Sequence, residues 1–481
     1  MLVSIIILTA FFFNTLLKKT EFSPSKAFSA DNEDSPFGFL PAAVLPPFKY
    51  GINNPYDFAL DLGVKWDRSI IFVWTLIQKD LQKEEYIWRH EHQLRDVPKG
   101  INLLCNIIIA DQSMDPKYSR YALSNKSYLP GDEVAYKKYV KAVVERYDGD
   151  SINDFIGLKV PVKYWQVDNE PRGDLKDYAS FLKMTYEAIR EADEDARVLI
   201  GGVQGMPPVS RYIEHFDKHY LPILDELSKF EKSYFDIFDF HWYGNATGDY
   251  LGIKEVYLHI EKKLKERNLM PLYGFWITEM GTYSGDPDPV PQLDFIDFPF
   301  QTERQQAIDL VKRFVFSLSL GIKKIFMAFG ITEGFKYDEG YFDFTGLIYD
   351  GQYDYDKGRG VKKISYYTYK KMVEVLENAD WDNIKTIREN DGIHIYRFVK
   401  NNRPIWVAWN DNSESKKISL TLDSGIKKVE ITEFVPNYKT GYDIRDYDTS
   451  FVDVKGEISE GSPFMLNFEL GEVPLFVKEK Q

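Results

Sequence analysis

Eight short apolar runs, separated by longer stretches with helical periodicity, set the pattern of the chain between Phe37 and Leu376. The runs are continuous rather than alternating, which is typical of parallel strands covered on both faces. The stretches between them, such as 136–147 and 178–189, carry apolar residues at i, i+3 and i+4 spacing. The eight runs are Phe37–Leu40, Ser69–Val73, Asn102–Ile108, Val162–Val167, Val198–Val203, Phe235–His241, Tyr273–Thr278 and Lys324–Phe329.

This order of elements predicts the α/β fold class. Eight strand–helix repeats predict a (β/α)₈ TIM barrel with enlarged loops. The main alternative is a doubly wound sheet, but no Gly-x-Gly-x-x-Gly motif follows the first strand.

After about Ala379 the helical periodicity ends, and short strands alternate with turn signals such as Asn401-Asn402. A stretch of about 100 residues with this pattern predicts an antiparallel β-sandwich. We therefore expect a leader at 1–34, the barrel at 35–379 and the β-sandwich domain at 380–481. The sandwich strands are expected at Gly392–Val399, Ile405–Trp409, Lys417–Leu422, Lys428–Phe434 and Phe464–Leu470.

The first residues form an apolar segment, Met1–Leu17, that is near the upper limit for a signal peptide and short for a membrane span. Lys18 and Lys19 follow this segment rather than precede it. We expect a cleaved signal peptide, with an uncleaved anchor as the alternative, and therefore a secreted, periplasmic or cell-surface protein. A membrane contact is expected only through this anchor.

Composition excludes several function classes. With 60 basic and 74 acidic residues the net charge is −14, which disfavours binding to nucleic acid. The single cysteine, Cys105, excludes an intrachain disulfide framework, and its place in an apolar run predicts a buried side chain. The pairs His90–His92 and His215–His219 do not match a metal-ligand motif, so neither a metal nor another cofactor is expected.

Two of the expected strands end on glutamate, Glu170 after Val167 and Glu279 after Thr278. In a TIM barrel the chemistry lies at the C-terminal ends of the strands. By our count these are strands four and seven, nearly opposite across the mouth. Cleavage of a glycosidic bond needs a protonated carboxyl group on one side of the sugar ring and an ionised carboxylate on the other. Glu170 and Glu279 could supply these two groups.

The triplet Asn169-Glu170-Pro171 after an apolar strand, with a second strand-terminal glutamate at Glu279, resembles the clan A retaining glycoside hydrolases. The layout is most similar to the family that holds β-xylosidases and α-L-iduronidases, family 39. The resemblance implies that Glu170 is the acid/base and Glu279 the nucleophile, and that Asn169 binds the substrate 2-hydroxyl.

The same resemblance extends to other strand ends. It implies that Arg68 keeps Glu279 anionic, that Tyr243 orients this nucleophile and that His241 lines the site. Trp74 follows the stretch that matches the arginine-bearing strand, and the resemblance implies that it also binds the substrate. Many clan members place a tryptophan at the end of strand eight, whereas this chain has Phe329. Either Phe329 takes its place as the sugar platform and binds substrate, or this subsite is built differently.

We therefore expect a retaining glycoside hydrolase that cleaves β-linked glycosides or oligo- and polysaccharides, with carbohydrate as its partner. Two alternatives stay open: a transglycosylase that uses the same residues, and a non-catalytic carbohydrate-binding or surface protein on a barrel scaffold. The sequence does not fix the sugar, the linkage or the oligomeric state.

Two long loops, 284–300 and 333–356, are expected to shape the sugar subsites. The second loop supplies aromatic residues that could stack on sugars. They are Tyr337, Tyr341, Phe342 and Phe344.

Overall fold

The computed structural model describes residues 33–40, 55–109, 128–171, 177–287, 298–333, 340–351, 356–459 and 464–480. The apolar segment Met1–Leu17 and Tyr337 lie outside these residues. Among the described helices, none is both long and apolar enough to cross a lipid bilayer.

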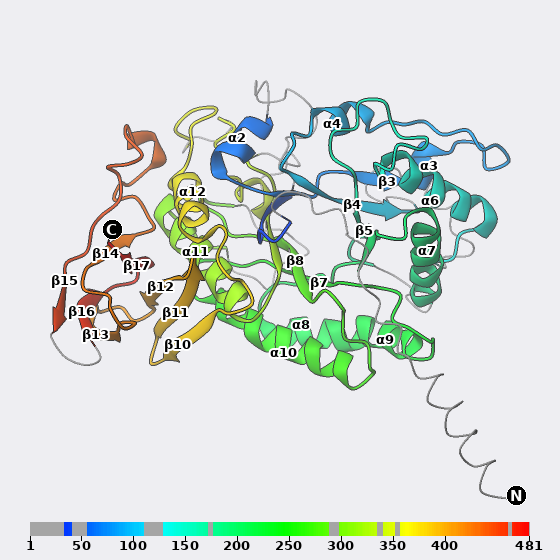
Figure 1. The fold of residues 1–481 in the computed structure, drawn as a ribbon. Helices are drawn as coiled ribbons and strands as arrows, with labels where there is room; N and C mark the ends of the chain where they lie inside the picture. Colours follow the sequence, from blue (N-terminus) through cyan, green and yellow to red (C-terminus); the bar gives the residue numbers. More distant parts are fainter. Residues whose placement is uncertain are drawn as a thin grey trace, which may run out of the picture.

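Parallel strands form a barrel that closes on itself (Figure 1). The order along the sheet is β6-β5-β4-β2-β1-β9-β8-β7, with β3 paired to β4. Parallel bridges from Leu199 to Ile237 and from Val203 to Phe240 join its two ends, so the predicted TIM barrel is confirmed. The strands are β1 (Phe37–Leu40), β2 (Trp66–Asp67), β3 (Ile71–Val73), β4 (Asn102–Ile108), β5 (Tyr164–Val167), β6 (Arg197–Ile200), β7 (Phe238–Trp242), β8 (Phe275–Met280) and β9 (Lys324–Ala328).

The second position in the barrel differs from the prediction of one strand at Ser69–Val73. The structure has two short strands there, because β2 pairs with β1 and β4, whereas β3 pairs only with β4. The interruption between them contains Arg68, whose backbone N–H still donates to the Phe39 carbonyl at 3.1 Å.

Helices surround the barrel (Figure 1). Local capping explains where two of them begin. The Asp132 side chain accepts a hydrogen bond from the N–H of Ala135, and Thr302 and Gln305 form a reciprocal capping box. The helices are α2 (Pro55–Leu62), α3 (Trp74–Ile77), α4 (Glu91–Asp96), α6 (Glu133–Tyr147), α7 (Tyr178–Ala192), α8 (Val209–His215), α9 (Leu221–Leu227), α10 (Gly252–Lys265), α11 (Glu303–Ser319) and α12 (Ile364–Leu376).

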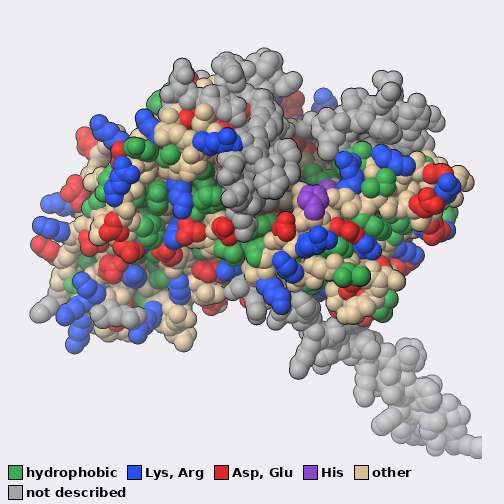
Figure 2. Space-filling model, turned by 90° about the horizontal axis from the view of Figure 1, so that it is seen from above, with side chains coloured by type: hydrophobic (Ala, Val, Ile, Leu, Met, Phe, Trp, Pro, Cys, Tyr) green, Lys and Arg blue, Asp and Glu red, His purple; other side chains and the backbone are tan. Residues whose placement is uncertain are grey.

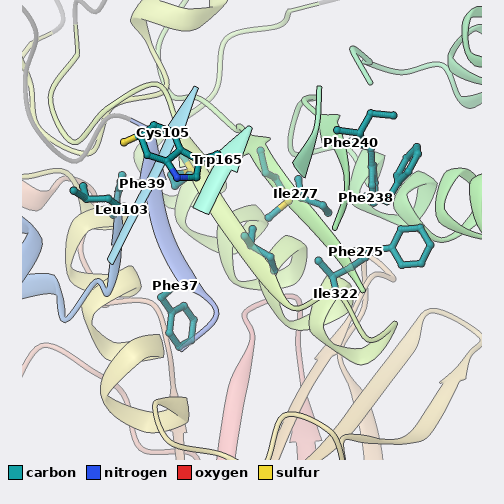
Figure 3. Packing of buried hydrophobic residues seen from close by; sticks show 14 of the residues in the cluster. Phe37, Phe39, Leu103, Cys105, Trp165, Phe238, Phe240, Phe275, Ile277 and Ile322 are labelled. Atoms are coloured by element: carbon teal, nitrogen blue, oxygen red, sulfur yellow. The ribbon is translucent and has the colours of Figure 1, made fainter. Parts of the chain in front are cut away.

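The barrel strands separate an outer hydrophobic core from an inner one. Along β4, Leu103, Cys105 and Ile107 pack outward against the helices, while Leu104 faces the interior. This follows from the alternation of side chains along a strand. Figure 3 shows outward-facing members of this core, with Cys105 beside Trp165 of the neighbouring strand. Cys105 is 0% exposed, so its predicted burial is confirmed.

Aromatic side chains fill the base of the barrel interior, at the N-terminal ends of the strands. The rings of Trp66 and Trp276 meet edge to face at 5.2 Å, and Phe326 stacks on Trp276 at 6.1 Å. The Lys324 ammonium lies 5.3 Å from the Trp66 ring. The Trp66 indole also donates to the Ser35 carbonyl at 2.9 Å, which ties the start of the described chain to this base.

The C-terminal region contains two antiparallel sheets, as expected for a β-sandwich. Their orders are β10-β11-β12-β17-β14 and β13-β16-β15. Three of these strands, β10, β15 and β17, were not expected from the sequence. The strands are β10 (Lys385–Asn390), β11 (Ile393–Lys400), β12 (Arg403–Asn410), β13 (Lys416–Thr421), β14 (Val429–Glu433), β15 (Gly456–Ser459), β16 (Met465–Leu470) and β17 (Leu475–Glu479).

The sandwich lies beside α11 and α12 (Figure 1). A polar cluster centred on Asp411 joins it to the barrel: Lys312 of α11 donates to Asp411 at 2.8 Å, and the Tyr250 hydroxyl also donates to it. From the sandwich itself, His394 contacts Asp411 at 3.1 Å. Acidic and basic side chains are interspersed over the face of the molecule seen in Figure 2.

We expect Asp411→Ala to destabilise the protein by about 2 kcal/mol, because Lys312 and Tyr250 lose a charged hydrogen-bond partner at a half-buried junction. Burial alone would raise the pKa of Asp411, but His394 and Lys312 outweigh it and hold this pKa below its usual value. The stabilisation is therefore present above the ordinary carboxyl pKa and is lost as the pH falls.

Urea denaturation at neutral and acidic pH measures this effect. The matched control is Asp423→Ala, which removes the more exposed pair with Arg397 in the same domain. This control should cost only about 0–1 kcal/mol. Equal losses for the two variants would contradict a special role for Asp411.

Candidate active site

Polar side chains replace aromatic ones toward the C-terminal end of the barrel interior. Gln166 of β5, Asp239 of β7 and Thr278 of β8 are each 0% exposed. The Gln166 amide donates to Asp239 Oδ2 at 2.5 Å, and the Thr278 hydroxyl donates to the same oxygen at 2.6 Å. These bonds satisfy groups that would be costly to bury alone. They form a polar layer beneath the mouth of the barrel.

Glu279 reaches the mouth through an irregularity in β8. The pairing of β8 with β9 shifts register between Ile277 and Met280, and the pairing with β7 shifts between Asp239 and His241. Bulges of this kind redirect side chains and are common beside active sites. Here Thr278 faces the polar layer, and Glu279, 4% exposed, lies next to His241 of the adjacent strand.

Glu170 lies just beyond the end of β5, on a short turn. Asp168 and Glu170 have φ angles of 68° and 49°, in the left-handed region that few residues other than glycine adopt. The Asn106 side chain of β4 holds this turn by donating to the Asp168 carbonyl at 3.0 Å. Glu170 is 8% exposed, so its carboxylate faces the interior of the mouth rather than open solvent.

The turn and the irregular strand bring the two glutamates together. One carboxylate oxygen of Glu170, one of Glu279 and a ring nitrogen of His241 lie within 4.8 Å of one another. The His241 Nδ1 is 2.8 Å from Glu170 Oε1 and 3.5 Å from Glu279 Oε2. This upper limit on the oxygen–oxygen distance is compatible with the about 5–5.5 Å separation typical of retaining glycosidases and falls below the about 6.5–9.5 Å of inverting ones.

Arg68 binds three neighbours with its guanidinium group. It donates to Glu279 Oε1 at 2.8 Å, to Gln166 Oε1 at 2.7 Å and to Asn169 Oδ1 at 2.5 Å. Both members of the Arg68–Glu279 ion pair are buried. A guanidinium is always charged and suits such a planar fork. Arg68 therefore places a positive charge beside Glu279 and also positions Asn169.

The Tyr243 hydroxyl donates a hydrogen bond to the second oxygen of Glu279. Burial, with the negative charge of Glu279, raises the pKa of Tyr243 well above its ordinary value. Tyr243 therefore keeps its proton and remains a donor. Each oxygen of Glu279 thus has a donor, Arg68 on one side and Tyr243 on the other.

His241 carries a positive charge between carboxylates. Burial alone would lower its pKa, but Glu279 and Asp239 outweigh this effect and raise the pKa to about 10. Its Nε2 lies 3.3 Å from Asp239 Oδ2 and 3.2 Å from the Thr278 hydroxyl, while Nδ1 faces Glu170. A charged His241 donates on both sides, so it links the polar layer to Glu170.

Aromatic rings form one wall beside Glu279. Phe329 stacks on Tyr243 with centroids 6.1 Å apart and an interplanar angle of 6°, and Phe342 meets Phe329 edge-on at 4.8 Å. Phe342 is half-buried and Phe329 is 9% exposed. Tyr341 differs from the expected stacking role, because it is 0% exposed and its hydroxyl is bonded to the backbone of Gly244. Phe344, at 2% exposed, is also a packing residue.

The structure brings together all but one of the residues that the sequence assigned to the site. The exception is Trp74, which begins α3 and is 0% exposed. Its ring packs against Tyr136 and Tyr139 of α6, and its indole donates to Gln78 at 2.6 Å. Placing Trp74 in the site was therefore wrong, because the chain turns outward after β3. The residues that meet at the mouth are Arg68, Asn169, Glu170, His241, Tyr243, Glu279 and Phe329.

Sequence reasoning did not assign the supporting residues Gln166, Asp239 and Thr278. The sequence does contain a signal for two of these residues, Gln166 and Asp239. Gln166 interrupts an apolar strand, and Asp239 lies two residues before His241, so the two share one face of β7. A buried polar residue two positions before a functional one on a strand indicates a supporting layer.

Similarity to known proteins appears in three dimensions only. No protein-family model and no curated protein matches the chain. A family 39 glycoside hydrolase from Bacteroides cellulosilyticus WH2 aligns with a TM-score of 0.60 at 16% identity, covering 88% of this chain and 77% of that one. The chain therefore shares the fold of this glycoside hydrolase.

Other glycoside hydrolases share this fold at similarly low identity. A glucosidase from Croceicoccus marinus has a TM-score of 0.54 at 12% identity, covering 93% of this chain and 96% of that one. A family 51 α-L-arabinofuranosidase from Bifidobacterium longum has a TM-score of 0.51 at 12% identity, covering 93% and 98%. The resemblance expected from the sequence is thus confirmed at the level of the fold.

We expect the His241 imidazole to stay protonated up to about pH 9, because Glu279 and Asp239 stabilise its charge. The contribution of this charge to stability is complete below the ordinary pKa of 6.5 and is lost as the pH rises through about 10. Nitrogen-15 NMR of histidine-labelled protein measures the titration, with His241→Gln to assign the signal. Asp239→Asn should lower the midpoint, and a wild-type midpoint near 6.5 would contradict this charge assignment.

Proposed function

We propose that this protein is a retaining glycoside hydrolase that cleaves β-linked glycosides or oligo- and polysaccharides, with Glu170 as acid/base and Glu279 as nucleophile. The observation that carries the proposal is the pair of buried carboxylates with oxygens within 4.8 Å of each other at the mouth of the barrel. The different partners of the two groups support their different roles.

Glu279 is suited to attack. Its two oxygens are held by Arg68 and Tyr243, which favour the anion and fix its direction. In the first step it forms a bond to the anomeric carbon while Glu170 gives its proton to the glycosidic oxygen, and the leaving sugar departs with that proton. The product of this step is an ester between Glu279 and the sugar.

Glu170 is suited to change roles between the steps. Glu170 has given up its proton in the first step, so it is a carboxylate when the ester on Glu279 is present. Glu170 then accepts a proton from water as the water attacks the anomeric carbon, and Glu279 leaves as a carboxylate. The contact with His241 at 2.8 Å positions Glu170 in both steps.

The surroundings of the pair support a sugar ring as the substrate. Asn169, oriented by Arg68 at 2.5 Å, offers its amide to a hydroxyl next to the anomeric carbon. Phe329 and Phe342 provide an apolar wall of the kind on which the C–H faces of sugars stack. We further propose that the protein acts outside the cytoplasm, on the basis of the apolar segment at Met1–Leu17.

Removing either carboxylate should abolish or cripple turnover of aryl β-glycosides. Glu279→Gln should lower kcat/KM by about 10⁴-fold or more, because the nucleophile is lost. Glu170→Ala should lower it by about 10²–10⁴-fold, and azide or a good leaving group should restore part of the rate. Steady-state kinetics on xyloside, glucoside and galactoside substrates provide the measurement.

The matched control is Glu255→Gln on the exposed face of α10, which should leave activity unchanged. Circular dichroism and the Tm confirm that each variant is folded. Full activity of Glu279→Gln would refute the proposal.

A 2-deoxy-2-fluoro glycoside with a good leaving group should label Glu279 covalently. The fluorine slows the second step more than the first, so the ester accumulates. Mass spectrometry of peptides locates the label. Label on another residue, or inversion of the anomeric configuration seen by NMR, would exclude this mechanism. Transfer to added sugars in place of release to water would indicate the transglycosylase.

A further inference from the structure

A second group of carboxylates lies in the segment that connects β9 to α12. One carboxylate oxygen each from Glu333, Asp350 and Asp356 lies within 4.8 Å of the others. Glu333 is 0% exposed and Asp350 is 4% exposed, while Asp356 is half-buried. Three like charges at this distance repel one another strongly where water is excluded.

Glu333 has little compensation for its charge. The Lys363 ammonium contacts Oε1, but Oε2 has no hydrogen-bond partner among the described residues. Lys363 also donates to the Ser284 hydroxyl at 2.9 Å and to the Phe344 carbonyl at 3.3 Å, so its charge is shared with neutral partners. A buried carboxylate oxygen without a donor is costly and calls for an explanation.

We propose that Glu333, Asp350 and Asp356 bind a divalent cation, and that this cation is calcium. All three side chains offer hard oxygen ligands, and the cluster includes no nitrogen or sulfur ligand. Calcium accepts 6–8 oxygens in flexible geometry, so backbone carbonyls and water can complete its shell. Its two positive charges replace the missing compensation at Glu333.

The cation connects the two ends of the segment that carries the aromatic wall. Glu333 lies four residues after Phe329, and its backbone N–H donates to the Ile348 carbonyl at 2.9 Å. Asp356 lies near the start of α12. Phe342 lies between these ligands in sequence and forms part of the wall. A cation at this place fixes the segment independently of any catalytic step, so the proposal does not require the proposed hydrolase activity.

Another acidic trio, Asp148, Asp150 and Asp154, provides the contrast. Its carboxylates already accept bonds from backbone N–H groups: Gly149 and Ser151 donate to Asp154 at 3.1 and 2.7 Å. This trio is a hydrogen-bonded turn with its charge partly satisfied. It serves as the control for acidic side chains in general.

The first test uses the full chain after EDTA treatment and dialysis. Calorimetric titration with calcium chloride should show one saturable site, and calcium should raise the Tm by about 3 °C or more. Absence of both heat and a Tm shift would overturn the proposal.

Variants locate the site. Glu333→Gln should abolish calcium binding. Because it also leaves the buried Lys363 without its anionic partner, circular dichroism checks that the variant is folded. Asp150→Asn should bind calcium as the wild type does. If Glu333→Gln fails to fold, Asp356→Asn at the half-buried edge of the cluster tests the same point. Calcium binding that survives Glu333→Gln or Asp356→Asn, or is lost in Asp150→Asn, would overturn the assignment.

Discussion

The candidate site depends on one buried positive charge, the guanidinium of Arg68. A buried carboxylate is costly unless a positive charge or a hydrogen-bond donor pairs with it. Arg68 provides both by binding Glu279 at 2.8 Å, and it orients Asn169 and Gln166 with its remaining donors. The break between β2 and β3 leaves Arg68 free to turn inward. In the proposed mechanism, the nucleophile Glu279 and the substrate contact Asn169 are therefore both positioned by Arg68.

The interior of the barrel changes character along its axis. Trp66, Trp276 and Phe326 fill the base, Gln166 and Asp239 follow above them, and the functional carboxylates lie at the mouth. Each level supports the next, since a packed base fixes the strands and the polar layer fixes His241. Register irregularities in β7 and β8 then set the positions of His241 and Glu279 at the mouth. The site is thereby held by regular elements and does not rely on loops alone.

The barrel and most of the candidate site residues were predictable from the sequence. The physical reasons for this also explain which elements were missed. Continuous apolar strands reveal a covered parallel sheet, and strand-terminal residues such as Glu170 and Glu279 reveal its mouth. Strands β10 and β15 were missed because most of their side chains are exposed and polar, so hydrophobic periodicity cannot mark them. Trp74 was misplaced because the outward turn after β3 depends on packing against α6, a long-range contact.

The packed base of the barrel restricts the route by which small molecules reach Glu170 and Glu279. Trp66 and Phe326 are 0% exposed and Trp276 is 3% exposed, so the described side chains fill the axis below the polar layer. Among the described residues, this packing leaves the C-terminal end of the barrel as the side from which a molecule can reach Glu170 and Glu279. In the proposed hydrolysis, the departing sugar and the incoming water would therefore use the same side. The residues around that side would then influence which acceptor reaches the anomeric carbon first.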